Sequence, residues 1–434
     1  MSARIACTAL AGASSRRAAQ RGAAALMVVM VLFFLVSLVA AYASRNLIFE
    51  QRISVNQYRS TQAFEAAEAG LEWALSMLNS GRVTAACAGS AVAADTSFRE
   101  RYLTFNANGT LTPRSYVSGA STLPLLPGCS RTASGWSCSC PTNSLDLLTA
   151  TAGPGSFPAF RVRLFGVGQA GMVRVAVTGC TAAVEGCLSG TTVGAGLATA
   201  TISQVVALKS GLFTPPAAAL TSGGTIDLVA GSALRVSNTD PATNGITVNA
   251  GGTVDATDLV LSSVPGAPTA PTVLDADSTL SAPTADRRFA NVFGMRPETY
   301  RRQPSALVFD CTVDCSAGTL RTAASLHPGR PLWVTGDLQL DSDGDIGSAT
   351  APTVLVVTGN LDVSAASVRI FGLVYSRAAT WTASGSPLIQ GAAIAEGNLA
   401  GTSSGAVVYD PDILGLLTRG SGSFVRVPGG WRDF

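Results

Sequence analysis

The chain has 434 residues with a formal net charge of +2 at pH 7, and 13% of its residues are charged. This low charge and the lack of a basic cluster argue against nucleic acid or any other polyanionic partner. Together with 45 Gly, many Ala, Ser, Thr and Val residues indicate an exported, β-rich protein of two or three domains rather than a cytosolic enzyme.

The first predicted element is an apolar helix over residues 23–43, which carries no charge and follows a leader containing four arginines. At 1.5 Å per residue this helix spans about 31 Å, the thickness of the hydrocarbon core of a bilayer. The arginines of the leader are expected to stay in the cytoplasm. The remainder of the chain then lies outside the inner membrane as a single-pass protein.

Three kinds of export segment are compatible with this run. Ala41-Tyr42-Ala43 fits the small-residue cleavage site of a secretory signal, although the apolar run is long for one. A plain membrane anchor needs no cleavage. The third kind is a prepilin-type leader, residues 1–22, which is cut on the cytoplasmic side between Gly22 and Ala23.

The helix is predicted to continue beyond the membrane, because residues 46–79 contain no Pro and a single Gly. Apolar residues recur at spacings of three and four and form one stripe for packing. With the membrane run they give one helix over residues 23–80, roughly 85 Å long. The stripe consists of Phe64, Ala67, Leu71, Leu75 and Leu78.

This N-terminal region resembles the PilX family of type IV pilus assembly proteins, which are minor pilins. The resemblance rests on the blocks 20–29 (QRGAAALMVV) and 62–72 (QAFEAAEAGLE), with weaker matches at 409–414 and 427–432. It implies processing by a prepilin peptidase, assembly with major and minor pilins, and an inner-membrane assembly platform. It also implies an inner-membrane location before assembly and then a periplasmic or extracellular pilus of a Gram-negative bacterium.

One residue departs from the pattern of major pilins, which carry Glu at the fifth mature position. Met27 stands there in this chain. The family's Glu is thought to pair with the free N-terminal amine of a neighbour, since an unpaired carboxylate is costly in lipid. A subunit without it is expected at the filament tip. The tip pseudopilin of type II secretion also lacks this Glu, so that machine is the alternative.

Basic residues recur every seven positions along the helix extension and precede a group of acidic residues. In staggered parallel helices, the acidic part of one helix could meet the basic part of another and set the axial offset. A solvated face with weak local pairs is the other interpretation. The residues are Arg45, Arg52, Arg59, Glu65, Glu68 and Glu72.

Nine cysteines fit an oxidising compartment. One, Cys7, lies in the leader, which leaves an even eight for the exported part. Two short spacings favour small closed loops, Cys180 with Cys187 and Cys311 with Cys315.

Residues 81–219 are predicted to form a pilin-like head with an antiparallel sheet packed on the helix extension. Strand candidates with alternating or continuous apolar residues lie at 160–167, 172–178 and 198–208. The proline pair in residues 214–216 indicates a linker.

Residues 220–434 form a Gly-rich region of short apolar triplets. The segment Val334–Leu338 recurs as Val357–Leu361 and more loosely as Ala395–Leu399, and Gly372–Tyr375 recurs as Gly391–Ile394. A period near 20 favours a β-solenoid, in which each coil buries its apolar residues against the next. A β-sandwich is the alternative.

Candidate chemistry is scarce. His327 beside Pro328 favours a surface turn over a catalyst, and residues 401–405 match G-x-S-x-G without the strand-turn-helix context that a nucleophile needs. Asp341, Asp343 and Asp345 are spaced like the start of a calcium loop, but the later loop positions are missing, so a solenoid turn competes with a calcium site.

The sequence therefore predicts an α+β protein with a long N-terminal helix, an antiparallel pilin-like sheet and a C-terminal β-solenoid. The resemblance implies a non-enzymatic minor pilin that takes part in assembly or initiation of a type IV pilus and displays a domain for adhesion. No cofactor is expected, apart from calcium at the aspartates. A membrane-anchored β-helix adhesin or carbohydrate-acting protein is a further alternative.

Overall fold

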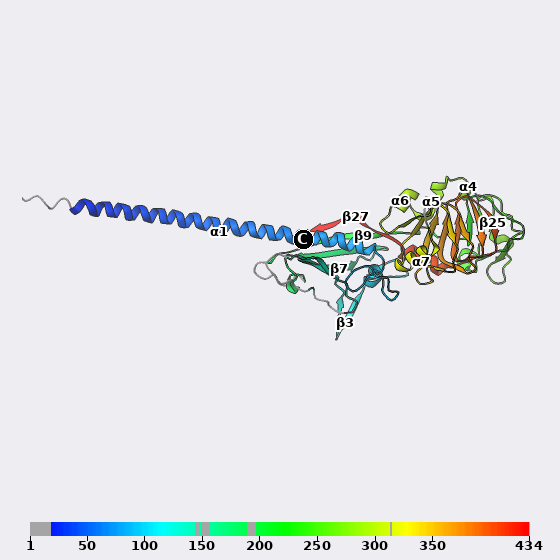
Figure 1. The fold of residues 1–434 in the computed structure, drawn as a ribbon, viewed down its shortest axis with the longest axis horizontal. Coiled ribbons are helices and arrows are strands. Elements are labelled where there is room, and N and C mark those ends of the chain that lie inside the picture. The colour runs from blue at the N-terminus through cyan, green and yellow to red at the C-terminus, as the bar shows by residue number, and fades with distance from the viewer. Residues whose placement is uncertain (1–18, 144–147, 149–156, 189–196, 313–314, 434) are drawn as a thin grey trace, which may run out of the picture. The chain divides into compact units, whose positions relative to one another are not determined.

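The computed structural model describes residues 19–143, 148, 157–188, 197–312 and 315–433 (Figure 1). The side chains of residues 19–23, Asn46 and Glu185 are outside this description. The chain divides into two compact units, Met1–Thr61 and Gln62–Phe434. Together these residues make a long N-terminal helix followed by a mostly β region, which confirms the mixed α+β class.

Helix α1 runs from Ala19 to Leu78. No proline interrupts it, and side chains satisfy the carbonyls that its last turn leaves without a helical partner. Asn79 Nδ2 donates to Leu75 O at 3.0 Å, and Ser80 Oγ donates to Met77 O at 2.7 Å. The helix therefore ends at Leu78, two residues before the predicted end at residue 80.

The head contains a six-stranded antiparallel sheet in the order β27-β9-β8-β7-β5-β6. Its strands alternate buried and less buried residues, most clearly in β8, because one face packs on the core. The three predicted strands correspond to β7, β8 and β9. The bounds are β5 Gly128–Thr132, β6 Gly135–Ser139, β7 Ala159–Gly166, β8 Met172–Cys180, β9 Thr199–Ser210 and β27 Gly422–Asp433.

Short elements complete the head. Helix α2 (Phe98–Tyr102) begins with a capping box, in which Ser97 and Glu100 satisfy each other's backbone N–H groups. Two small hairpins follow it, β1 with β2 and β3 with β4. The bounds are β1 Leu103–Phe105, β2 Leu111–Pro113, β3 Ser115–Ser118, β4 Ser121–Pro124 and α3 Glu185–Leu188.

The C-terminal region is built from short strands, and every pairing among β10 to β26 in the described residues is parallel. The bounds of the first eight are β10 Leu220–Ser222, β11 Ile226–Leu228, β12 Leu234–Ser237, β13 Val248–Ala250, β14 Leu259–Ser262, β15 Val273–Leu274, β16 Leu307–Asp310 and β17 Leu332–Thr335. The others are β18 Leu338–Leu340, β19 Gly344–Ile346, β20 Thr353–Val357, β21 Leu361–Val363, β22 Val368–Ser376, β23 Thr380–Gly385, β24 Leu388–Ala395, β25 Asn398–Ser403 and β26 Ala406–Tyr409.

The sequence repeats of this region stack in register. Val334 pairs with Val357 and Leu338 with Leu361, so the two copies of the repeated segment lie side by side. Gly372 pairs with Gly391 in the same way. Residues at equivalent positions of two repeats thus lie side by side on neighbouring strands.

The order of the strands in space differs from their order in the chain. The large sheet runs β14-β12-β26-β24-β22-β20-β17-β16, so the first strands of the region join its last ones. Leu220 pairs with Ala393, and Val236 pairs with Val407. Strand β16 follows the short helices within residues 278–301 and lies at the opposite edge of the sheet. The sequence repeats did not predict that the first strands of the region pair with its last ones.

Helices flank the parallel strands. Helix α5 buries Phe289 and Phe293 in an aromatic cluster with Tyr300, Trp333 and Tyr375. The bounds are α4 Ser278–Ser281, α5 Ala285–Phe293, α6 Pro297–Arg301, α7 Ala317–Leu326 and α8 Pro411–Gly420, with 3₁₀ turns at Pro241–Thr243 and Ala270–Thr272.

The predicted boundary of the last domain, 220–434, needs correction. Strand β27 leaves that region and pairs antiparallel with β9 of the head, from Gly422 opposite Ser210 to Asp433 opposite Ile202. Phe424 is almost fully buried in the head core. The C-terminal segment is apolar enough to be a strand, but its partner β9 lies far earlier in the chain, and local patterns do not reveal such a distant pairing.

Candidate functional site

The first half of α1 exposes its apolar side chains. Residues 24–61 are exposed almost throughout, with Met27 at 73% and Phe33 at 74%. Among the described residues, α1 is the one helix long and apolar enough to cross a membrane, and its most apolar window is 0% buried. So large an exposed apolar surface requires lipid or other apolar helices around it.

The charged residues predicted to align neighbouring helices lie mostly on the exposed surface. Arg45 and Arg52 are exposed, as are Glu65 and Glu68, and Arg59 is partly exposed. Glu72, in contrast, pairs with Arg426 of β27 within the same chain. Glu65 and Glu68 therefore remain at the surface, where another subunit could reach them.

The second half of α1 packs on the head through small residues. Ala63, Ala67 and Ala74 are fully buried, whereas the predicted contacts Phe64 and Leu75 are only partly buried. The predicted Leu71 and Leu78 are buried. The predicted stripe included Ala67, and the structure adds Ala63 and Ala74 to the buried face.

Two glycines explain why small residues form this face. A Cβ at Gly179 would lie 2.2 Å from Ala63 O and 2.4 Å from Ala67 N, so the sheet touches the helix backbone there. A Cβ at Gly70 would lie 2.6 Å from the Phe160 ring. Helix and sheet thus approach too closely for larger residues at these positions.

A buried arginine joins the end of α1 to the C-terminal segment. Arg99 Nε donates to Leu78 O at 2.9 Å, and its Nη1 donates to Gly422 O at 3.0 Å. The guanidinium carbon also lies 5.3 Å from the centre of the Phe424 ring. Burial lowers the pKa of the Arg99 guanidinium to about 10, so it remains charged at neutral pH.

Asn79 makes a second connection at the same place. Phe424 N donates to Asn79 Oδ1 at 2.8 Å, while Asn79 Nδ2 donates to Phe424 O at 3.0 Å. The Asn79 side chain thus satisfies both backbone polar groups of Phe424, which also lies opposite Leu208 of β9. The end of the helix and the start of β27 are held together by polar groups from both.

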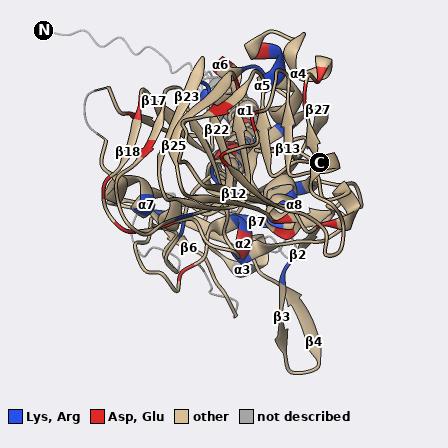
Figure 2. Ribbon diagram, turned by 90° about the vertical axis from the view of Figure 1, so that its right-hand side faces the viewer, with Lys and Arg blue, Asp and Glu red and all other residues tan. Residues whose placement is uncertain are grey.

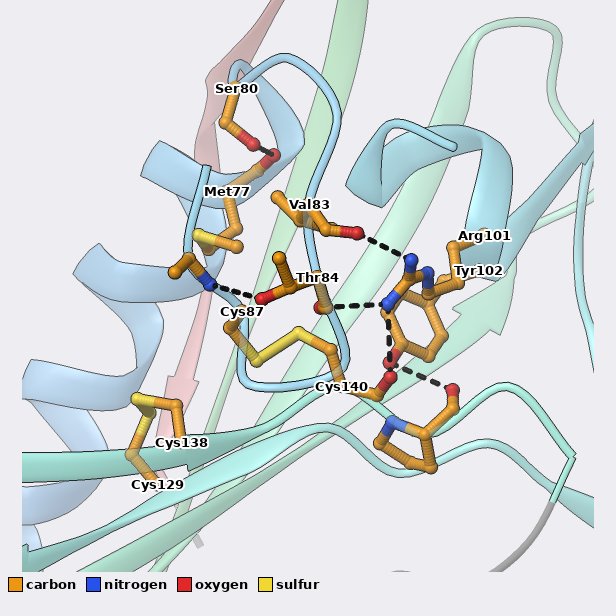
Figure 3. The surroundings of a disulfide bond; sticks show 12 residues. Met77, Ser80, Val83, Thr84, Cys87, Arg101, Tyr102, Cys129, Cys138 and Cys140 are labelled. Carbon is orange, nitrogen blue, oxygen red and sulfur yellow. Dashed lines mark hydrogen bonds between the residues drawn. A yellow bond between two sulfur atoms is a disulfide. The ribbon is translucent and has the colours of Figure 1, made fainter. Parts of the chain in front are cut away.

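A disulfide and a second arginine close the loop that follows α1 (Figure 3). Cys87 is bonded to Cys140. Arg101 Nη1 donates to Thr84 O at 2.9 Å and to Cys140 O at 3.1 Å, and its Nη2 donates to Val83 O. Figure 3 shows the guanidinium reaching both segments of the loop beside the sulfur atoms.

The remaining disulfides include both predicted pairs. Cys180 is bonded to Cys187 and Cys311 to Cys315, as their spacing predicted. Cys129 is bonded to Cys138 across the β5–β6 hairpin. Cys7 lies outside the described residues.

The three aspartates predicted to bind calcium do not share a partner. Asp343 Oδ1 accepts from Ser367 N at 2.8 Å, and Asp345 forms a two-pronged ion pair with Arg369 at 2.7 and 2.8 Å. Asp341 is exposed. No group of three metal-ligating side chains gathers within the described ranges. Calcium binding here stays a prediction without support from the geometry.

The remaining catalytic candidates have structural surroundings. His327 follows the last residue of α7 and is half-buried, and burial lowers the pKa of its imidazole. Ser403, the serine of the G-x-S-x-G match, is buried in β25, and its hydroxyl donates to Gly385 O. Within the part of the chain that the structure describes, neither side chain is hydrogen-bonded to a base or acid that would activate it for catalysis.

The predicted processing position lies at the start of α1. Gly22 and Ala23 are within the helix, but their side chains and residues 1–18 of the leader are outside the described part of the chain. Processing itself therefore stays a prediction.

Comparison with protein families decides the class of the N-terminal region. Residues 21–72 match the PilX N-terminal family, which spans the exposed half of α1 and most of the packed half. Residues 21–72 are therefore a PilX-type N-terminal segment, the kind found in type IV pilin-like proteins.

Two solved structures show partial likeness to this chain. The competence-associated pilin ComZ from Thermus thermophilus is 13% identical, with 87% of this chain and 97% of that one covered and a TM-score of 0.20. An ice-binding protein domain from Shewanella frigidimarina is also 13% identical, with 46% and 98% covered and a TM-score of 0.19. Both TM-scores are below 0.5, so neither establishes a shared fold. No curated protein sequence matches the chain.

Proposed function

We propose that this protein is a minor pilin, inserted in the inner membrane by α1, cut after Gly22 by a prepilin peptidase and delivered to a type IV pilus by the assembly platform of a Gram-negative bacterium. The observation that carries the proposal is the exposed apolar half of α1 within a PilX-type segment. That surface is suited first to lipid and then to the packed helices of a filament core.

Met27 supports a position at the tip or in low copy number. Its side chain is 73% exposed on a helix that carries no acidic residue before Glu50. A neighbour's N-terminal amine would find no carboxylate near this position, so growth on that side of the subunit is not supported. The same feature favours the tip pseudopilin of a type II secretion machine as the second candidate.

The C-terminal region supports a display role. Its parallel strands stack one sequence repeat upon the next, as in a β-solenoid, and enclose a continuous apolar core. We propose that this β-solenoid domain mediates adhesion, without enzymatic activity, cofactor or nucleic acid.

The decisive experiment determines the N-terminus by mass spectrometry. The protein is taken from sheared surface filaments and from membranes, with and without the prepilin peptidase. A filament species that starts at Ala23 and is lost without the peptidase supports the proposal. A start at Ser44, or an intact leader found solely in membranes, contradicts it.

A second experiment tests packing through the exposed acidic residues. We expect Glu65→Lys with Glu68→Lys to reduce incorporation into filaments at least tenfold, because both carboxylates lie at the surface of the helix. The matched control is Asp227→Lys with Asp275→Lys, the same charge change at exposed positions of the C-terminal region. Equal incorporation of both variants, measured by quantitative immunoblotting of sheared filaments, contradicts helix pairing through these residues.

A further inference from the structure

The strands of the head sheet carry charges of nearly one sign. Their charged residues are basic with the single exception of Asp433, although the whole chain has a net charge of only +2. Around α5 of the C-terminal region, in contrast, basic and acidic residues lie close together (Figure 2). The head sheet is therefore a local source of positive potential. Its basic residues are Arg131, Arg161, Arg163, Arg174, Lys209, Arg426 and Arg432.

Strand β8 shows which face of the sheet each side chain occupies. Val173, Val175 and Val177 are fully buried in the core that the sheet shares with α1. Successive side chains of a strand point to opposite faces, so Arg174 and Ala176 belong to the face that points away from α1. We call this the outer face of the head sheet.

The register of the strands brings two further arginines to the outer face. Arg163 of β7 lies opposite Ala176 of β8. Ala176 in turn lies opposite Ser203 of β9, which lies opposite Arg432 of β27. Residues opposite each other in an antiparallel sheet point to the same face. With neighbouring strands about 4.8 Å apart, the backbones of Arg163 and Arg432 are about 14 Å apart in one row across the sheet.

The positive charge of the outer face is not compensated. Arg163 and Arg432 are exposed, and Arg174 is partly exposed. Within the described part of the chain, none of the three forms an ion pair. Asp433 lies opposite Ile202, which is buried in the core, so the acidic residue of these strands belongs to the other face. An anion can therefore approach these arginines without displacing a partner.

An exposed aromatic ring accompanies the arginines. Phe165 of β7 lies opposite Arg174 and is 37% exposed. The guanidinium carbon of Arg163 lies 4.7 Å from the centre of the Phe165 ring. Arg174 lies opposite Val205 of β9, which is partly buried. The outer face thus combines guanidinium groups with apolar surface.

One end of the outer face is covered within the chain, and the other end is open. Near the start of β7, Ala159 and Cys180 are buried in a small cluster with Cys187 and Leu188 of α3. The end that carries Arg163 and Phe165 lies beyond this cluster, on the opposite side of the sheet from residues 62–78 of α1. It therefore stays accessible when α1 packs among other helices.

We propose that the open end of the outer face, formed by Arg163, Phe165, Arg174 and Arg432, binds an acidic polysaccharide whose sugars carry carboxylates. Guanidinium groups bind carboxylates through two parallel hydrogen bonds. A sugar ring also presents C–H groups to the exposed ring of Phe165, which the carboxylates of an acidic polypeptide do not. One polymer chain that crosses the strands reaches Arg163 and Arg432 together, so its contacts reinforce each other. This inference rests on the proposed display role and adds a binding surface on the head.

Biolayer interferometry with the purified full-length protein, in an uncharged detergent without a sugar headgroup, tests the proposal. The probes are polygalacturonate, polyglutamate and single-stranded DNA matched in number of charges, with neutral dextran as the blank. We expect at least tenfold tighter binding of polygalacturonate than of the other polyanions, and at least tenfold weakening between about 50 and 300 mM salt. Binding of polyglutamate or DNA as tight as that of polygalacturonate, or no binding of polygalacturonate, overturns the proposal.

Variants locate the binding. Arg163→Gln with Arg174→Gln should weaken polygalacturonate binding at least tenfold. The matched control, Arg235→Gln with Arg287→Gln, removes the same charge at exposed positions of the C-terminal region and should stay within twofold of the unmodified protein. If the Arg174 substitution lowers the melting temperature, Arg163→Gln with Arg432→Gln gives the same test at two exposed positions. Equal binding by the outer-face and control variants overturns the site.

A further variant tests the contact with the sugar ring. Phe165→Ala should weaken binding of polygalacturonate at least threefold and leave the binding of polyglutamate unchanged, because it removes apolar surface and no charge. Equal changes for both polymers would contradict recognition of the sugar. None of these measurements needs a filament, so failure here is separable from failure of the pilin assignment, which N-terminal sequencing tests.

Discussion

The two halves of α1 differ in how they use apolar residues. Residues 24–61 carry Leu, Val, Phe and Met on all sides and leave them exposed on the helix surface. Residues 62–78 bury mainly alanines, together with Gly70, against the head sheet. The more apolar half is thus the exposed one. High hydropathy on all sides of a helix indicates that its surroundings are apolar. Small side chains, in contrast, indicate where a helix packs closely on a sheet.

The largest effect is expected from substitutions that disrupt only the exposed part of α1, residues 24–61. Leu32→Arg with Leu35→Arg should cost roughly 3 kcal/mol per residue for membrane insertion, so the protein should be lost from membranes and filaments. Fractionation and immunoblotting measure this loss. Leu32→Ala with Leu35→Ala keeps the segment apolar and should remain in both fractions. Normal incorporation of the arginine variant would refute a lipid or helix-core environment.

The next largest effect is expected from a substitution that disrupts the contact of residues 62–78 of α1 with the head sheet. Gly179→Val places a side chain where even a Cβ lies 2.2 Å from Ala63 O, so we expect a loss of about 3 kcal/mol of stability from overpacking. Thermal melting followed by near-UV circular dichroism measures the change. Gly89→Ala is the control, because nothing lies within 4 Å of its added Cβ. Similar melting of both variants would contradict the close helix–sheet contact.

A smaller effect is expected at the end of the second half. Arg99→Met removes the donor of Leu78 O and Gly422 O and should cost about 2 kcal/mol, with a lower melting temperature. Limited proteolysis should also cut earlier near β27. Arg235→Met, at an exposed position, should match the unmodified protein. If Arg99→Met is equally stable, the buried arginine does not hold the helix to the C-terminal segment.

The smallest effect concerns the pair Glu72–Arg426. Both side chains are largely exposed, at 66% and 45%, so Glu72→Gln should change stability by less than about 1 kcal/mol. A double-mutant cycle with Arg426→Gln, read by thermal melting, gives the coupling between the two residues. A coupling as large as the loss expected for Arg99→Met would show that the second half depends on this exposed pair as much as on its buried contacts.

The sequence by itself determined the elements that depend on neighbouring residues. The apolar run and the absence of Pro predicted one continuous helix over residues 23–80, close to the observed end of α1 at Leu78, because helix formation depends on local hydrogen bonds. Hairpin-connected strands in the head and the short disulfide loops were also predicted, because their partners lie close together in the sequence. The repeat that relates Val334 to Val357 also matched the register of their strands.

Tertiary structure alone decided what depends on distant partners. It placed β10 beside β24 and β27 beside β9, and it brought Arg99 to the carbonyls of Leu78 and Gly422. It also added Ala63 to the packed face of α1, on which Phe64 and Leu75 are only partly buried, because Gly179 permits a closer approach. The outer face that joins Arg163 to Arg432 arose in the same way. Each of these features joins segments far apart in the chain, whose pairing is set by the packing of the whole core rather than by local pattern.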